Sequence, residues 1–176
     1  MKFICLSLLL IFSGSLLAQQ KVNPAVPSFG GIYPIPEATV RPDSMMRYRI
    51  VVDVRTGADA AGQPSAGLSN VARMLNLHHV GGVTKDMMEV VLAIHGDATF
   101  SVLNNAAYKR KYGINNPDLD LIRELKVAGV QLTVCGQSLK GRNIKSEDVL
   151  REIDIATSML TTLSTCQLRG FAVFQF

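Results

Sequence analysis

The sequence is poor in cysteine and lacks the short motifs that mark several common enzyme classes. It has 3 cysteines in 176 residues, and no two of them form a CxxC pair. It contains no P-loop, no nucleophile-elbow serine and no glycine fingerprint for dinucleotides after its first expected strand. These absences argue against P-loop NTPases, Rossmann-type dehydrogenases, α/β-hydrolases and thioredoxin-like oxidoreductases.

Signals for metals and nucleic acids are weak as well. The 3 histidines and the cysteines show no regular ligand spacing, so we expect no metal site and no cofactor. His78 and His79 lie at the end of an expected helix, where a cation suits the helix dipole. The formal net charge of +4 is small and its basic residues are scattered, so no nucleic-acid partner is expected.

Residues 1–18 have the pattern of a cleaved secretory signal. Lys2 makes the start positive, Phe3–Phe12 is apolar, and Ser13–Ala18 ends in a small residue. The apolar run is too short to span a bilayer comfortably. We therefore predict an exported protein, periplasmic or secreted, whose mature chain begins near Gln19 and has no transmembrane segment after signal cleavage.

Residues 19–46 form a proline-rich extension that holds five of the 7 prolines. Proline fixes φ and removes a backbone donor, so this segment is expected to be extended and irregular. Two interpretations are open. The segment is either a linker toward the membrane side or, because Phe29, Ile32, Tyr33 and Ile35 alternate with its prolines, a strap lying on the domain or on a neighbour.

Residues 47–176 alternate apolar runs with segments of helical periodicity. Strands are expected at 48–54, 87–95, 130–134, 153–156 and 171–176, and helices at 66–80, 101–112, 117–128 and 159–168. Nearly continuous β-branched runs such as YRIVVDV are typical of strands buried on both faces of a parallel sheet. The pattern predicts a single domain, a three-layer α/β/α sandwich with a mainly parallel sheet of about five strands.

Cys135 ends the third expected strand, at the sheet edge where α/β proteins collect ligands and reactive groups. A helix starting near Gln137 or Ser138 would direct backbone N–H groups at the thiol, and Lys140, Arg142 and Lys145 follow closely. Such surroundings favour the thiolate. The alternative is that Cys135 is a small buried residue of the core, which is common for free cysteine.

His95 ends the second expected strand at the same edge and is followed by Gly96. It is either a partner of Cys135 or a histidine satisfied by backbone at a turn. Together with Gly136, Gln137, Ser138, Lys140 and Arg142, it completes the candidate site. Cys166 falls late in a helix that returns the chain toward the opposite edge of the sheet, so we predict a core position for it and no disulfide with Cys135.

Several short segments resemble the DsrE/DsrF family. They are VCGQSL around Cys135, the HG pair at His95, SNVARMLN from Ser69, and the closing LRGFAVFQF from Leu168. The signal-like leader and the FGGIYPIP segment resemble an exported branch of that family. The resemblance covers residues 47–176.

The resemblance implies an α/β sandwich assembled as a homo-oligomer, a trimer or a hexamer. It also implies a cysteine that carries sulfur as a persulfide and exchanges it with a donor or acceptor protein. In the sulfur-relay subunits of the family the active cysteine follows an earlier strand. The VCGQSL segment is instead typical of uncharacterised members, so the role of Cys135 does not transfer directly.

Two hypotheses of function follow. In the first, the protein is a thiol-dependent sulfur carrier or transferase that acts through Cys135. In the second, it is a non-catalytic oligomeric module that binds a small anion or a protein partner in the periplasm, and Cys135 merely lines the pocket. No second cysteine lies near Cys135 in the sequence, so turnover would need an external thiol or a partner.

Overall fold

Five parallel strands form one sheet in the order β4-β3-β2-β1-β5. The computed structural model describes residues 20–176, so the expected signal peptide lies outside the described residues. The strands are β1 (Tyr48–Val54), β2 (Met88–Ile94), β3 (Gln131–Cys135), β4 (Asp154–Ala156) and β5 (Ala172–Gln175). The parallel sheet predicted from the alternating pattern is confirmed.

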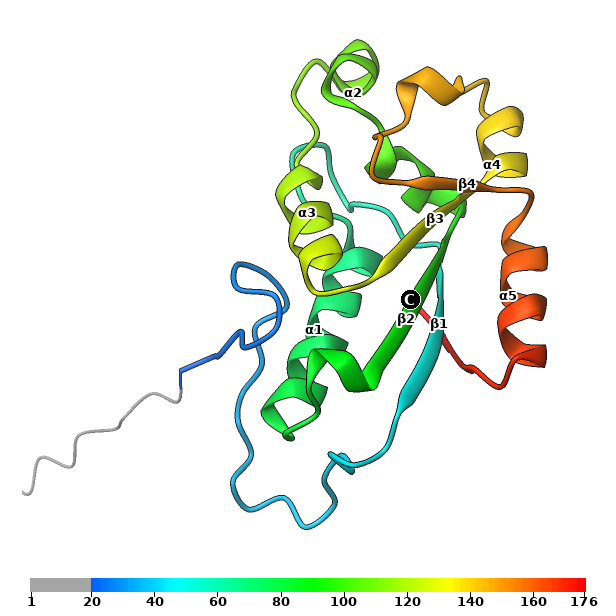
Figure 1. Ribbon diagram of the computed structural model, residues 1–176. Coiled ribbons are helices and arrows are strands. Elements are labelled where there is room, and N and C mark those ends of the chain that lie inside the picture. The colour runs from blue at the N-terminus through cyan, green and yellow to red at the C-terminus, as the bar shows by residue number, and fades with distance from the viewer. Residues whose placement is uncertain (1–19) are drawn as a thin grey trace, which may run out of the picture.

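Helices cover both faces of this sheet, but unequally. The α-helices are α1 (Ala66–Val80), α2 (Asn105–Tyr112), α3 (Leu119–Val127), α4 (Gly136–Gly141) and α5 (Met159–Leu168). The short 3-10 helices are η1 (Lys85–Met87), η2 (Gly96–Val102) and η3 (Ser146–Asp148). Figure 1 shows α1 and α3 on one side of the sheet, here called the first face, and α5 on the other, the second face.

Alternation along the strands assigns side chains to these two faces. Ile50 and Val52 of β1 belong to the main core with the inner positions of α1 and α3. Val51 instead packs with Val91 and Cys166 in a smaller cluster under α5. Because successive strand residues point to opposite faces, the continuous apolar runs are explained by burial on both sides. No helix among residues 20–176 is long and apolar enough to cross a membrane.

The helix predicted at 101–112 is wrong in its first part. Residues 96–102 form η2, and α2 begins only at Asn105. Asn104 is the N-cap of α2, because its side chain accepts a hydrogen bond from the Ala107 N–H at 2.9 Å. In the shorter helix Ala106 is exposed, whereas Tyr108 is buried.

The next helix also starts later than its sequence signals indicated. Asn116, which precedes the expected range 117–128, does not cap the helix, because its amide group donates to the carbonyls of Ser101 and Leu103. Its Oδ1 accepts from the Asp118 N–H, which closes a turn before α3. The apolar residues Leu121, Ile122 and Leu125 form the buried face of α3.

The proline-rich segment lies on the domain and is anchored by a single buried side chain. Asn76 of α1 is fully buried. Its Oδ1 accepts from the N–H groups of Ala25 and Val26, and its Nδ2 donates to the carbonyls of Phe29 and Gly30. Val26 is itself 0% exposed. These contacts favour the strap over the free linker for this part of the segment.

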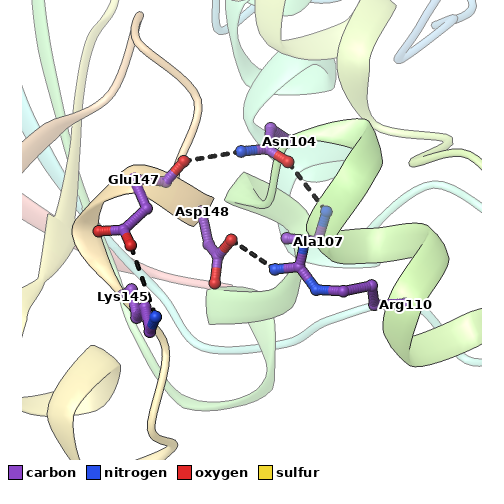
Figure 2. A network of polar contacts seen from close by, with 6 residues as sticks. All are labelled: Asn104, Ala107, Arg110, Lys145, Glu147 and Asp148. Carbon is purple, nitrogen blue, oxygen red and sulfur yellow. Dashed lines mark hydrogen bonds and ion pairs between the residues drawn. The ribbon is translucent and has the colours of Figure 1, made fainter.

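A polar network ties α2 to the loop that carries η3, far along the chain (Figure 2). Asn104 donates to the Glu147 carbonyl, and Arg110 pairs with Asp148 at 2.5 Å. The Asn104 N–H also donates to the Asp148 carbonyl at 2.8 Å. This network holds the loop after α4 and thereby helps to fix the edge of the sheet at which β3 and β4 end.

Candidate functional site

Cys135 lies where the chain leaves two neighbouring strands in opposite directions. After β3 the chain enters α4, whose Leu139 joins the core of the first face. After β4 the chain enters α5, which covers the second face. β3 and β4 are adjacent in the sheet, with Cys135 paired to Ala156. Such a divergence at the carboxyl ends of parallel strands is where open α/β sheets bind ligands.

The thiol of Cys135 is buried and surrounded by hydrogen-bond donors. The residue is 3% exposed, and its Sγ lies 3.9 Å from Ser158 Oγ. Burial by itself would raise the pKa of this thiol. Hydrogen bonds from the Met159 N–H and from the hydroxyl and N–H of Ser138 outweigh burial, together with the Ser158 hydroxyl, and the net pKa is lowered.

Ser158 serves the helix and the thiol at the same time. It is the N-cap of α5, and its Oγ accepts a hydrogen bond from the Leu160 N–H at 3.2 Å. The same oxygen also accepts from the thiol of Cys135, and in the thiolate form the hydroxyl proton can donate to the sulfur instead. The start of α5 thus contributes both a hydroxyl and the Met159 N–H to one side of the thiol.

Gly136 allows β4 to approach the site closely. A Cβ at this position would lie 2.8 Å from the carbonyl oxygen of Ala156, which is shorter than such contacts allow. Any other residue would therefore push β3 and β4 apart just where Cys135 and Ser158 meet. The glycine that follows Cys135 is explained by this contact.

His95 is bound to Asp53 at the same edge of the sheet. Its Nε2 pairs with Oδ1 of the Asp53 carboxylate, and both side chains are largely buried, 20% and 13% exposed. The register pairs Ile94 with Val134, so His95 and Cys135 occupy the next positions of adjacent strands. No hydrogen bond joins His95 to Cys135 in the part of the chain that the structure describes.

A family model for the DsrE/DsrF-like family matches residues 46–176. The chain belongs to the DsrE/DsrF-like family. Its fold is similar to that of the ychN protein from E. coli, at 20% identity over 73% of this chain and 99% of that one, with a TM-score of 0.54. The protein of unknown function MTH1491 from Methanobacterium thermoautotrophicum matches at 17% identity over 73% and 99%, with a TM-score of 0.49. No curated protein matches the chain.

In this DsrE/DsrF-like chain the basic residues predicted for the site face elsewhere. Lys140 is exposed, and Arg142 lies 3.8 Å from Asp97 and over the ring of Phe100. Neither is among the groups that lower the pKa of Cys135. The thiolate is stabilised by short-range hydrogen bonds rather than by nearby positive charge.

The remaining predicted residues lie at the same edge with different roles. Gln137 is exposed in the first turn of α4, whereas Ser138 contacts the thiol. Gly96 has φ +55°, a left-handed conformation that lets η2 begin directly after His95. A Cβ at Gly96 would also lie 3.0 Å from the Arg55 carbonyl oxygen.

Sequence reasoning missed Ser158, Met159 and Asp53. A signal for the first two was present, because a serine before the helical run at 159–168 is an N-cap pattern. What the sequence did not provide was the strand order that places this N-cap beside β3. Asp53 is separated from His95 by 42 residues, and only the pairing of β1 with β2 joins them.

Cys166 is buried like Cys135, but its surroundings and the direction of its pKa shift differ. It packs under α5 with Val51, Val91 and Phe171, and burial raises the pKa of its thiol. Both cysteines are free. The predictions that they do not pair and that Cys166 is a core residue are confirmed. Among residues 20–176 no cluster of three or more ligating side chains could hold a metal ion.

Proposed function

We propose that this protein is a sulfur carrier or sulfurtransferase that holds sulfur as a persulfide on Cys135. The observation that carries the proposal is the set of hydrogen-bond donors from Ser138, Ser158 and Met159 that lower the pKa of a buried thiol. Thiolates, not thiols, are the nucleophiles of sulfur exchange. Membership of the DsrE/DsrF-like family supports a sulfur-relay-type protein at the level of the family, and the assignment to Cys135 rests on its surroundings.

Loading requires a persulfide donor R–S–SH, a low-molecular-weight or protein persulfide. The Cys135 thiolate attacks the terminal sulfur of the donor. A new bond forms between Sγ and that sulfur, the S–S bond of the donor breaks, and the thiolate R–S⁻ leaves. The product is Cys135–S–SH, so no external oxidant or reductant is consumed.

Unloading reverses the roles with an acceptor thiol. The acceptor thiolate attacks the outer sulfur of the Cys135 persulfide, and Cys135 departs as a thiolate. A thiol of lower pKa leaves faster in such exchanges. The same donors that stabilise the Cys135 thiolate before loading therefore also favour its departure, as a carrier requires.

The acceptor must come from outside the domain. Cys166 is the other cysteine among residues 20–176, and it is buried in the separate cluster under α5. The proposal therefore includes a partner protein or a small thiol as donor and acceptor. It also places the protein outside the cytoplasm, as the signal-like leader supports, and in a homo-oligomer, trimer or hexamer, as the family resemblance supports.

Persulfide loading tests the proposal directly. The purified protein is treated with a glutathione persulfide solution, freed of excess reagent, and weighed by intact mass spectrometry. We expect a gain of one sulfur atom that Cys135→Ser abolishes and Cys166→Ser preserves. A folded wild-type protein that takes up no sulfur would contradict the carrier role. That outcome would favour the alternative, a non-catalytic module that binds a small anion or a protein partner at this edge of the sheet.

A further inference from the structure

The ion pair between Asp53 and His95 lies beside the thiol site and has no role in the chemistry described so far. Asp53 belongs to β1, and His95 directly follows β2. The backbone N–H of His95 donates to the Val54 carbonyl at 2.9 Å, so the residue continues the pairing of the two strands. The His95 ring is therefore fixed both by its backbone and by the carboxylate of Asp53.

Strand alternation places three side chains on the same face of the sheet. Asp53 lies two residues beyond Val51, which packs on the second face under α5. His95 lies four residues beyond Val91, which packs on that face as well. Cys135 contacts Ser158 and Met159 at the start of α5, the helix that covers the second face.

The three residues therefore follow one another across adjacent strands. Asp53 of β1, His95 after β2 and Cys135 of β3 occupy the carboxyl edge in that order, and neighbouring strands lie about 4.8 Å apart. Nε2 of His95 is occupied by Asp53. Nδ1 takes no hydrogen bond among residues 20–176, which leaves one ring nitrogen for a group bound at the thiol.

We propose that His95 is the acid–base residue for sulfur exchange at Cys135 and that Asp53 positions it. A role in stability alone is a poor explanation, because a buried ion pair commonly costs as much desolvation as it gains. A carboxylate behind an imidazole instead fixes the orientation of the ring, as in other acid–base pairs of this type. This proposal rests on the sulfur-carrier function given above.

One group that gives and then takes back a proton accounts for the proton balance of both steps. In loading, protonated His95 gives its proton to the leaving thiolate, so that R–SH departs and His95 is left neutral. In unloading, neutral His95 takes the proton of the acceptor thiol as its sulfur attacks the Cys135 persulfide. His95 is then protonated again, the outer sulfur leaves as R′–S–SH, and Cys135 is restored as a thiolate.

Two disulfide probes separate acid catalysis from a general effect on the site. Attack of Cys135 on hydroxyethyl disulfide releases a basic thiolate that benefits from a proton. Attack on dipyridyl disulfide releases a weakly basic thiolate that does not. For His95→Gln and Asp53→Asn we expect the rate with hydroxyethyl disulfide to fall at least about tenfold. The rate with dipyridyl disulfide should change by less than about twofold, since the nucleophile is intact.

Matched variants complete the test. His78→Gln removes a histidine whose ring contacts the Met74 carbonyl in α1, and it should leave both rates unchanged. Asp53→Glu keeps a carboxylate and should retain more of the hydroxyethyl disulfide rate than Asp53→Asn. This comparison tests the proposal even if His95→Gln fails to fold. Equal losses with both probes, or no loss with either, would overturn the role of His95 and Asp53. A wild-type protein that cannot be persulfidated would instead contradict the carrier function.

Discussion

The Sγ atom of Cys135 and the Oγ atom of Ser158 lie 3.9 Å apart, although 23 residues separate them in the chain. This contact joins the end of β3 to the N-cap of α5. The hydroxyl that accepts a hydrogen bond from an otherwise unpaired N–H at the start of α5 therefore also stabilises a thiolate. The chemistry of the site depends on the adjacency of β3 and β4, and on the two helices that diverge from them.

A thiolate titration of the folded protein should show one cysteine, Cys135, that ionises at a lower pH than the other. In Cys166→Ser, the ultraviolet absorbance of the Cys135 thiolate is expected to rise with a midpoint below about 8.5, the ordinary pKa of a free thiol. In Cys135→Ser, the midpoint of Cys166 is expected to be raised, because burial dominates there. A Cys135 midpoint at or above the ordinary value would contradict the role of the surrounding donors.

Ser158→Ala should raise the pKa of Cys135 and also weaken the start of α5. Loss of an N-cap typically costs about 1 kcal/mol of unfolding free energy. Ser65→Ala is the matched control, since Ser65 caps α1 by accepting from Leu68 and does not touch the thiol. Thiolate titration and denaturant unfolding of both variants distinguish the two effects. If Ser65→Ala shifts the Cys135 midpoint equally, the shift comes from general destabilisation.

The lowered pKa of Cys135 makes stability depend on pH in a known direction. Between the lowered folded pKa and the ordinary thiol value of about 8.5, the unfolded state binds more protons than the folded state. The unfolding free energy of the wild type should therefore rise with pH across this window, and the gain should be lost as pH falls through the folded pKa. Denaturant unfolding of Cys166→Ser and of the Cys135→Ser, Cys166→Ser double variant at several pH values isolates the contribution. Parallel pH curves for the two proteins would show that Cys135 does not contribute to the pH dependence of stability.

Gly136→Ala should destabilise the domain and disturb the thiol, because its Cβ would press on the Ala156 carbonyl oxygen. Overpacking of this kind costs about 1–3 kcal/mol. Gly141→Ala in the same helix α4 is the matched control, since a Cβ there meets nothing within 4 Å and alanine favours the helix. Thermal unfolding compares the two. Equal thermal stability of both variants would mean that β4 shifts to accommodate the new Cβ without a loss of stability.

The elements that were foreseen are those with strong local signals. β1 and α5 match their expected ranges, because a continuous β-branched run and apolar residues at helical spacing act over short distances. The placement of Cys135 at the carboxyl end of a strand followed for the same reason. The 3-10 helix η2 was not foreseen. Its Ala98 N–H donates to the Arg55 carbonyl, a tertiary hydrogen bond that the local sequence pattern does not indicate.

The electrostatics of the site were harder to foresee than its position. Lys140 and Arg142 are near Cys135 in sequence, but Lys140 is exposed and Arg142 pairs with Asp97. Ser138, which was among the predicted residues, does lower the pKa of the thiol, but the other donors, Ser158 and Met159, come from the next strand connection. Which neighbouring strands meet is a property of the whole sheet, so this part of the site requires the topology.

Asn76 gives the sharpest test of the strap, which the sequence left undecided between a free linker and a packed segment. Its side chain makes four hydrogen bonds to the backbone of residues 25–30. Asn76→Ala should lower the unfolding free energy by about 3 kcal/mol, because buried backbone groups lose their partners. It should also make residues 20–32 sensitive to limited proteolysis, as expected for a segment whose anchor is removed. Asn70→Ala, at an exposed position of the same helix α1, should leave stability and cleavage nearly unchanged. Equal resistance of both variants to protease would show that Val26 and the other apolar contacts hold the strap without this asparagine.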